Sequence, residues 1–322
     1  MRTRFSSCWV VTDGKAGMES QCVGLAEALG LHPDIKRVRL RAPWRALSPY
    51  LRLGLAHAFQ NKTAIAPPWP DLLIASGRLS VPASLYVRAQ SARVGKRSFT
   101  VQIQDPVISR SHFDLVIAPL HDGLAGSNVI STIGALHRVE PGKLAPDAAL
   151  LAPAVAALPR PFIGVLIGGS NGSYRLGAPE ITELASKLRA LASHMGAGLL
   201  ITPSRRTGDE NVSLLKALLN GTSAFIWDGE GWNPYFGILG LSDYLVVTAD
   251  SVNMISEACA SGKPVSIYDL PGGSRKSARF RDALFARGLV RPFAIPLDTC
   301  PAQPLNEMSE VVKAIANRLA AA

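Results

Sequence analysis

Cysteine is scarce in this sequence, and the cysteines that occur are scattered. Cys8, Cys22, Cys259 and Cys300 form no CxxC pair and no spacing typical of a zinc site. Such a pattern does not indicate a disulfide framework, because frameworks of that kind use closely spaced cysteines. We therefore expect reduced thiols, no structural or catalytic metal, and a cytoplasmic protein.

Long apolar runs are missing as well. The nearest candidate, residues 144–169, is interrupted by Asp147, Arg160 and several prolines, so it lacks the unbroken length of a membrane-spanning helix. The apolar run near the N-terminus is too short for the core of a signal peptide. These two absences also favour a cytoplasmic location.

Signatures of several function classes do not occur. The chain has no GxGxxG fingerprint, no P-loop and no GxSxG elbow, which argues against dinucleotide binding, triphosphate hydrolysis and serine hydrolase chemistry. It has no zinc finger, basic heptad region or RNA-binding aromatic signature, so we expect no nucleic-acid partner. The net charge of +10 nevertheless favours an anionic partner, either a phosphorylated substrate or an anionic lipid surface.

The sequence does contain repeated strand–loop–helix patterns across its 322 residues, 48% of which are hydrophobic. Expected strands cover 8–12, 35–40, 71–76, 99–104, 115–118 and 129–138, then 162–167, 199–202, 225–227, 244–247 and 265–268. Between the two sets, residues 140–161 are rich in Ala, Pro and Leu and read as a linker with a short helix. The pattern predicts an α/β protein of two Rossmann-like domains, 1–150 and 151–322, facing a cleft.

Polar residues recur where the strands of the first half end. They are Asp13, Ser76 with Arg78, Asp105, and His121 with Asp122. Because ligands bind outside the carboxyl ends of parallel strands, we expect these side chains at one edge. Asp13, Asp105 and His121 are the candidate catalytic bases. His121 is favoured, since a neutral imidazole accepts a proton near pH 7, although it equally suits a structural role through Asp122.

The second half is organised around residues 244–265. A β-branched strand leads into a cluster of helix-capping residues, Thr248, Asp250, Ser251 and Asn253, and a helix follows as far as Gly262. Free N–H groups at such a helix start bind anions, and Glu257, about one turn further, suits two neighbouring sugar hydroxyls. The alternative is an ordinary capped helix. Small residues at 168–173 and arginines at 205 and 206 follow other strands.

Residues 44–59 show a helical period with a basic border. Trp44, Leu47, Leu51, Leu55 and Ala58 fall on one face, flanked by Arg41, Arg45 and Arg52. Such a helix docks reversibly on an anionic membrane surface, or it packs on its own domain with solvated arginines.

Several of these stretches resemble one family. They are Gly14-Lys-Ala-Gly with Glu19 and Gln21, Ser76-Gly-Arg, Ile103-Gln-Asp-Pro, His121-Asp-Gly, Thr132-Ile-Gly-Ala-Leu-His137, and Thr248 to Cys259 with Gly262-Lys-Pro. Together they resemble the mitochondrial-fission ELM-type family, whose bacterial members are described as predicted nucleoside-diphosphate-sugar epimerases. The same C-terminal stretch is similar to nucleotide-sugar enzymes of the GT-B fold. Met18 departs from the family, where a polar residue, often His, is expected.

The resemblance implies a GT-B architecture whose C-terminal domain holds a nucleoside diphosphate. On that basis Ser251, Asn253 and Met254 offer donors to the phosphates, Glu257 binds the ribose, and Ser170 and Arg205 approach the diphosphate. The function implied is a metal-independent nucleotide-sugar enzyme without cofactor, a glycosyltransferase before an epimerase. Two alternatives remain: a non-catalytic scaffold of the fission type, associated peripherally with a membrane, and a small-anion binder. The base, sugar, acceptor and oligomeric state are left open.

Overall fold

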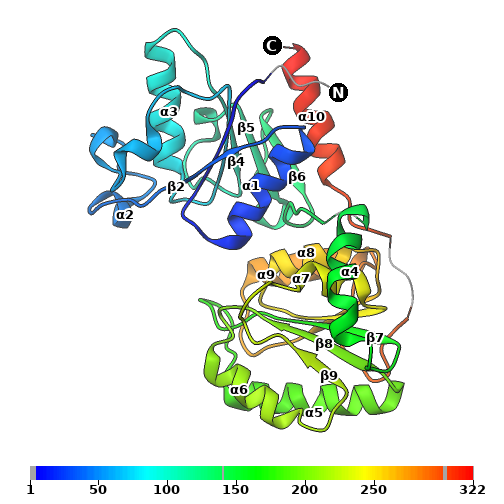
Figure 1. Ribbon diagram of the computed structural model, residues 1–322. Helices are drawn as coiled ribbons and strands as arrows, with labels where there is room; N and C mark the ends of the chain where they lie inside the picture. Colours follow the sequence, from blue (N-terminus) through cyan, green and yellow to red (C-terminus); the bar gives the residue numbers. More distant parts are fainter. Residues whose placement is uncertain (1–4, 140, 300–302, 322) are drawn as a thin grey trace. The chain divides into compact units, whose positions relative to one another are not determined.

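The computed structural model describes residues 5–139, 141–299 and 303–321. The chain divides into two compact units, Met1–Arg138 with Asn306–Ala322, and Val139–Leu305 (Figure 1). Each unit contains its own six-stranded parallel sheet, with orders β2-β1-β3-β4-β5-β6 and β12-β11-β10-β7-β8-β9. The expected α/β class with two Rossmann-like domains is confirmed.

The N-terminal sheet consists of strands with apolar residues on both faces. Its strands are β1 (Cys8–Thr12), β2 (Asp34–Arg37), β3 (Leu72–Ser76), β4 (Phe99–Ile103), β5 (Leu115–Pro119) and β6 (Val129–Thr132). Successive side chains alternate between the faces. Val10 packs with helix α1 (Ala16–Ala28) and helix α10 (Met308–Ala321), whereas Trp9 and Val11 pack in a second cluster with helix α3 (Val81–Arg93).

The end of the chain belongs to the N-terminal unit. Met308, Val311 and Ile315 of α10 lie in the same core cluster as Val10. The Glu307 carboxylate accepts hydrogen bonds from the backbone N–H groups of Ile133 and Gly134, directly after β6. This division differs from the sequence-based one into residues 1–150 and 151–322. The last helix returns to the first unit because the apolar face of α10 packs in the core that contains Val10, although the two are far apart in sequence.

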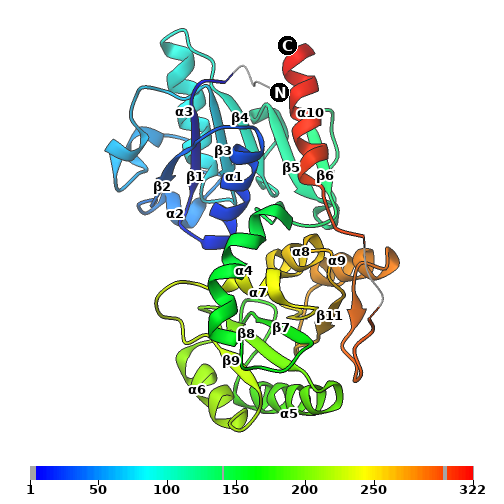
Figure 2. The same ribbon diagram turned by 45° about the vertical axis from the view of Figure 1, so that its right-hand side comes forward.

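The C-terminal unit begins with a helix, in the stretch where the sequence predicted a linker with a short helix. Helix α4 (Pro141–Val155) packs on α7 (Tyr235–Leu241), where Gly237 and Gly240 let the two backbones approach closely. The strands are β7 (Phe162–Ile167), β8 (Gly198–Pro203), β9 (Ala224–Ile226), β10 (Tyr244–Thr248), β11 (Val265–Tyr268) and β12 (Arg291–Pro292). The other helices are α5 (Ala178–Met195), α6 (Asp209–Leu218), α8 (Val252–Ala260) and α9 (Arg275–Ala286). Helices α8 and α9 lie side by side in both views (Figures 1 and 2).

The prediction of an amphipathic helix over residues 44–59 is wrong. Only Trp44–Leu47 is α-helical (α2), and short 3-10 turns follow at Leu55–His57 and Lys62–Ile65. Pro49 lacks the N–H that a helix interior needs, and Gly54 adopts a left-handed φ of 66°. The segment is therefore a loop that leaves several apolar side chains in solvent.

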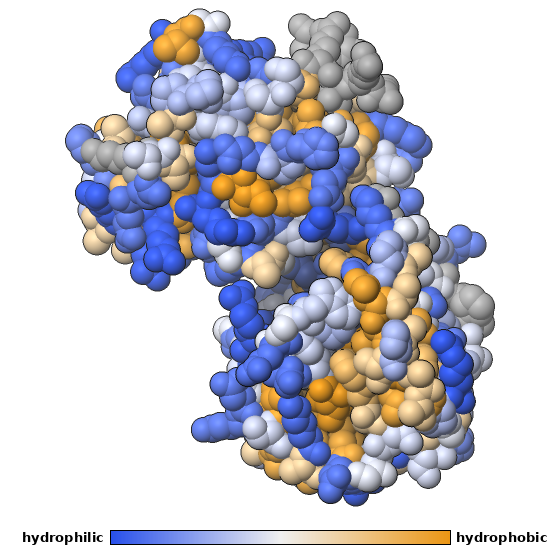
Figure 3. Space-filling view, viewed as in Figure 1, coloured by the Kyte–Doolittle hydropathy of each residue, from blue (hydrophilic) through white to orange (hydrophobic). Residues whose placement is uncertain are grey.

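Within the described part of the chain, no helix is both long enough and apolar enough to span a bilayer. Hydrophilic residues cover much of the face shown in Figure 3, with apolar patches between them on each unit. Cys8, Cys22 and Cys259 are buried free thiols, and burial raises the pKa of Cys8 and Cys259 to about 12. Cys300 lies outside the described residues.

Candidate functional site

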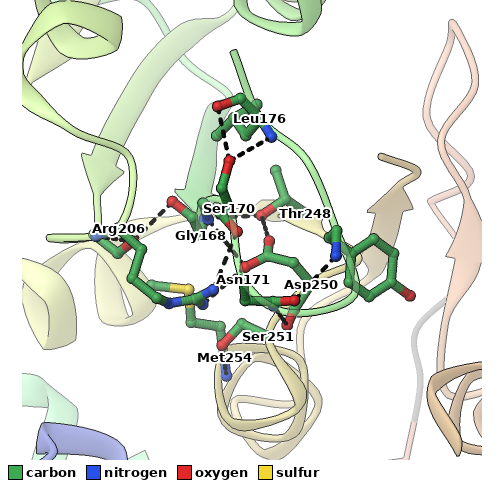
Figure 4. Close-up of polar contacts among 12 residues, drawn as sticks. Gly168, Ser170, Asn171, Leu176, Arg206, Thr248, Asp250, Ser251 and Met254 are labelled. Atoms are coloured by element: carbon green, nitrogen blue, oxygen red, sulfur yellow. Dashed lines mark hydrogen bonds and ion pairs between the residues drawn. The ribbon is translucent and has the colours of Figure 1, made fainter. Parts of the chain in front are cut away.

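Three neighbouring strands of the C-terminal sheet, β8, β7 and β10, end at one edge. The loops that follow them come together in a dense polar network (Figure 4). Parallel strands bring their carboxyl ends to the same side of a sheet, where small ligands bind in open α/β folds. This edge is the candidate site.

Asp250 is the centre of the network. Its carboxylate is fully buried and accepts hydrogen bonds from Thr248 Oγ1 (2.7 Å) and the Gly169 N–H (2.9 Å). The Arg206 guanidinium completes the set with an ion pair of 2.7 Å. Thr248 Oγ1 also accepts from the Gly168 N–H at 2.8 Å. A buried carboxylate needs such partners, so Asp250 fixes the loop after β7 against the start of α8.

Close packing requires glycine at positions 168 and 169. A Cβ on Gly168 would lie 2.1 Å from Asp250 Oδ2, and one on Gly169 would lie 2.1 Å from the Arg206 carbonyl oxygen. The sequence pattern suggested that small residues here let a backbone approach an anion. The tight approach in this structure is to the buried carboxylate and to the backbone after β8.

The loop after β7 is held by its own polar side chains. Ser170 Oγ accepts from the Leu176 N–H (2.9 Å) and donates to the Leu176 carbonyl (3.1 Å), so this hydroxyl is used within the loop. Asn171 Oδ1 accepts from two backbone N–H groups, those of Ser173 (2.8 Å) and Tyr174 (3.0 Å). Asn171 Nδ2 donates to the Asp250 carbonyl at 3.2 Å. The loop is therefore rigidly placed beside the start of α8.

Helix α8 begins at this network. Ser251 is its N-cap, in extended conformation, and its Oγ accepts from the Met254 N–H at 3.4 Å. The first N–H groups of a helix have no partner within the helix and carry the positive end of its dipole. No acidic residue occupies the first turn. The geometry thus suits an anion, while the Ser251 hydroxyl acts here as an acceptor.

Glu257, one turn further along α8, is 9% exposed. The hydroxyl of Tyr235, at the start of α7, donates to Glu257 Oε2. Burial raises the pKa of Glu257 to about 7, with the Tyr235 hydrogen bond acting in the opposite direction. Burial and the neighbouring Glu257 carboxylate raise the pKa of the Tyr235 hydroxyl well above its ordinary value. The Tyr235–Glu257 pair therefore contains one group, the Glu257 carboxyl, that titrates near neutrality, whereas the Tyr235 hydroxyl keeps its proton.

The residues expected around the diphosphate lie at one edge of the C-terminal sheet, and their side chains make different contacts there. Ser251 is the N-cap of α8 and Asn253 and Met254 lie in its first turn. Ser170 and Arg205 follow β7 and β8. Arg205 is exposed, whereas its neighbour Arg206 makes the ion pair with Asp250. Sequence reasoning did not assign Arg206 or Tyr235. The only signal available was a pair of adjacent arginines and one aromatic residue in a polar loop.

The candidate bases of the N-terminal unit follow β1, β4 and β5, which with β3 are neighbours in the sheet. Asp13 pairs with Lys15 Nζ at 2.7 Å, and Asp105 Oδ1 accepts from the Val107 N–H at 2.8 Å. His121 is buried, with Nε2 3.5 Å from Asp122 Oδ1. The topology brings the three to one edge, as the strand-end pattern predicts.

Arg78, after β3, is used structurally. Its guanidinium donates to the Ser48 carbonyl at 2.8 Å, and Ser48 Oγ donates back to the Arg78 carbonyl at 2.9 Å. These bonds attach the loop of residues 41–59 to the sheet edge. Across the described residues, no group of three or more His, Cys, Asp and Glu side chains is arranged to hold a metal ion.

Comparison with known proteins gives matches along the chain. A sequence model of the family described as "Mitochondrial fission ELM1" matches residues 16–319. The Mitochondrial fission protein ELM1 of Arabidopsis thaliana is 28% identical over 390 residues, covering 97% of this chain and 91% of that protein.

Solved structures show the same fold at low identity. UDP-GlcNAc 2-epimerase from Neisseria meningitidis, bound to UDP-GlcNAc, has a TM-score of 0.57 and 13% identity, with 98% of this chain and 100% of that chain covered. MurG from Acinetobacter baumannii has a TM-score of 0.50 and 11% identity, with 97% and 91% covered. These likenesses establish a GT-B-like fold.

Proposed function

The chain belongs to the mitochondrial fission ELM1 family, and we propose that its C-terminal unit binds a nucleoside diphosphate sugar at the start of α8. The proposal rests on the N-terminus of α8. It lies against the loop after β7, and hydrogen bonds to the buried Asp250 carboxylate hold the two together. Because the Arg206 guanidinium offsets the Asp250 charge, the buried carboxylate does not repel an anion at this edge.

Two further features support a nucleotide. Glu257 lies on α8 five residues after its first residue, Val252, and in this proposal its carboxyl group meets the ribose hydroxyls. The epimerase with a similar fold is a protein bound to UDP-GlcNAc. In this proposal the diphosphate accepts hydrogen bonds from backbone N–H groups of α8 and of the loop after β7. The exposed Arg205 side chain turns toward the diphosphate.

The reaction proposed is sugar transfer or epimerisation, without metal or cofactor. A base is then required, and His121, Asp13 and Asp105 of the N-terminal unit remain the candidates. His121 is the strongest of these, because the Asp122 carboxylate lies 3.5 Å from its Nε2 and imidazole is the side chain most often used as a general base.

A ligand-binding measurement tests the proposal. A thermal-shift panel with UDP, GDP, CDP and ADP and their sugars identifies the preferred nucleobase. A ligand bound only by the folded state raises the melting temperature of the protein. Calorimetry then compares wild type with Glu257→Ala. Loss of a ribose contact lowers affinity about ten- to hundredfold.

Glu183→Ala is the matched control, since Glu183 is an exposed residue of α5 that pairs with Lys187 on the same helix. Equal affinities for wild type and Glu257→Ala would show that Glu257 serves only the Tyr235 contact. A panel in which no nucleotide raises the melting temperature would contradict the proposal as a whole.

A second function, peripheral membrane association as a scaffold, rests on a different observation. Leu47, Tyr50 and Leu53 are 51%, 67% and 81% exposed, in the loop that also carries Arg41, Arg45 and Arg52. Apolar side chains enter a lipid interface while arginines contact anionic headgroups. The similarity to a mitochondrial fission protein favours this activity, with or without catalysis.

A further inference from the structure

Helix α9 begins at the same sheet edge as α8, since the strands β10 and β11 that precede them are neighbours. Its first turn contains Arg275 and Lys276 and no acidic residue. Cations at the positive end of a helix dipole are unfavourable unless an anion lies beside them. The first turn of α9 thus concentrates positive charge where the backbone already attracts anions.

The start of α9 is fixed rigidly. Ser274 Oγ accepts from the Ser277 N–H (3.1 Å), and Ser277 Oγ accepts from the Ser274 N–H (2.8 Å), which forms a capping box. The preceding Gly273 N–H donates to the Ser173 carbonyl at 2.6 Å. The loop before α9 is therefore tied to the loop after β7, which belongs to the site described above.

A buried hydroxyl faces this helix start. Tyr174 is 5% exposed, and within the described residues its Oη has no hydrogen-bond partner. Gly273 has a φ of +114°, and a Cβ at this position would lie 3.7 Å from Tyr174 Oη and 3.8 Å from Ser277 Oγ. The place of the missing side chain is thus a small space between two hydroxyls, directly before the helix, and Gly273 itself is exposed.

The nearest acidic side chain on the preceding loop does not oppose this charge. Asp269, which follows β11, forms an ion pair with Arg281 on the next turns of α9. The helix start therefore combines the positive charge of Arg275, the backbone N–H groups of a first helical turn, and a buried hydroxyl that has no hydrogen-bond partner among the described residues.

We propose that the start of α9 is a second anion site, which takes a phosphate or carboxylate group carried by the ligand beyond its diphosphate. The identity of that ligand rests on the proposed function. The existence of the anion site does not. An oxygen of the anion accepts from Tyr174 Oη in the space at Gly273, and Arg275 supplies the charge. A donor whose sugar bears an acidic group is accordingly preferred to its neutral counterpart.

The experiment has two arms and uses the full chain. In the first, calorimetry compares UDP-glucose with UDP-glucuronate, which differ by one carboxylate. Wild type is expected to bind the glucuronate about tenfold more tightly, and Arg275→Gln to bind the two almost equally. Arg287→Gln, the same change at the opposite end of α9, is the matched control and keeps the wild-type ratio. The same ratio in Arg275→Gln and wild type would overturn the proposal.

The second arm uses inorganic phosphate alone and does not depend on nucleotide binding. Phosphate is expected to raise the melting temperature of wild type, and Tyr174→Phe to weaken its binding about tenfold while unfolding no more easily without ligand. Phosphate binding that is unchanged by both Tyr174→Phe and Arg275→Gln would overturn the site. Phosphate binding at α9 without any preference for UDP-glucuronate would overturn the assignment to a distal ligand group.

Discussion

Asp250 and Arg206 form an ion pair of 2.7 Å in which the carboxylate is fully buried and the guanidinium is 40% exposed. The pair joins the loop after β8 to the start of α8, and through the Gly169 N–H it also fixes the loop after β7. One buried charge therefore organises three loops at the candidate site.

Arg206→Met is expected to lower the free energy of unfolding by roughly 2–3 kcal/mol, because it leaves the Asp250 carboxylate buried without its counter-charge. Partial exposure of Arg206 keeps the loss below that of a fully buried pair. Urea unfolding measures it. Arg205→Met, the exposed neighbour, should change stability by no more than about 0.5 kcal/mol. Equal effects of the two variants would mean that the pair contributes nothing to stability.

Gly168→Ala is expected to destabilise the protein by about 1–3 kcal/mol, because the added Cβ would lie 2.1 Å from Asp250 Oδ2. Gly172→Ala, in the same loop, is the matched control, since nothing lies within 4 Å of a Cβ there. Urea midpoints of the two variants decide the matter. A Gly168→Ala variant as stable as Gly172→Ala would show that the network relaxes without cost.

The Glu257 carboxyl predicts a pH dependence of stability. Burial raises its pKa to about 7 in the folded protein, from an ordinary value of 4.5. A raised pKa in an acid gives stability that is fully present below pH 4.5 and is lost as pH rises through 7. Relative to Glu257→Gln, wild type should lose on the order of 3 kcal/mol between these pH values. Urea unfolding of both proteins at pH 5, 6, 7 and 8 measures the difference. A constant difference would show that Glu257 stays ionised.

The proposed role of His121 as the general base predicts a selective loss of turnover in His121→Gln. Turnover of the best-binding nucleotide sugar should fall by about 10²–10⁴, the usual effect of removing a general base. The dissociation constant of the nucleoside diphosphate should stay within about twofold, since the proposed binding groups lie in the other unit. His112→Gln serves as the control. Unchanged turnover in His121→Gln would leave His121 with a structural role beside Asp122.

The proposed membrane docking by residues 41–59 predicts that vesicle binding depends on the charge of this loop. Co-sedimentation with vesicles containing phosphatidylserine should fall at least about tenfold in Arg45→Glu with Arg52→Glu, because each basic residue near an anionic surface contributes about 1 kcal/mol. Arg189→Glu with Lys216→Glu, two exposed positions on α5 and α6, makes the same charge change elsewhere. If both double variants bind alike, the arginines of the loop are solvated and take no part.

The sequence by itself determined the fold class and the strand ends at which the candidate residues lie. Apolar β-branched runs such as Tyr244–Thr248 carry their own strand signal, and capping residues such as Ser251 mark a helix start locally. The motifs around Thr248 and Gly14 were sufficient to indicate the family. These features are short-range, so each can be recognised within a few residues of sequence.

Only the tertiary structure decided how the polar side chains are used. Arg205 and Arg206 are equivalent in sequence, and the buried position of Asp250 alone selects Arg206 as its partner. The contact between Tyr235 and Glu257 joins residues 22 apart. Residues 44–59 have a helical period, yet Pro49 and Gly54 prevent the helix and the loop is instead held by Arg78. A hydrogen-bond partner depends on packing between distant segments, and neither periodicity nor local spacing contains that information.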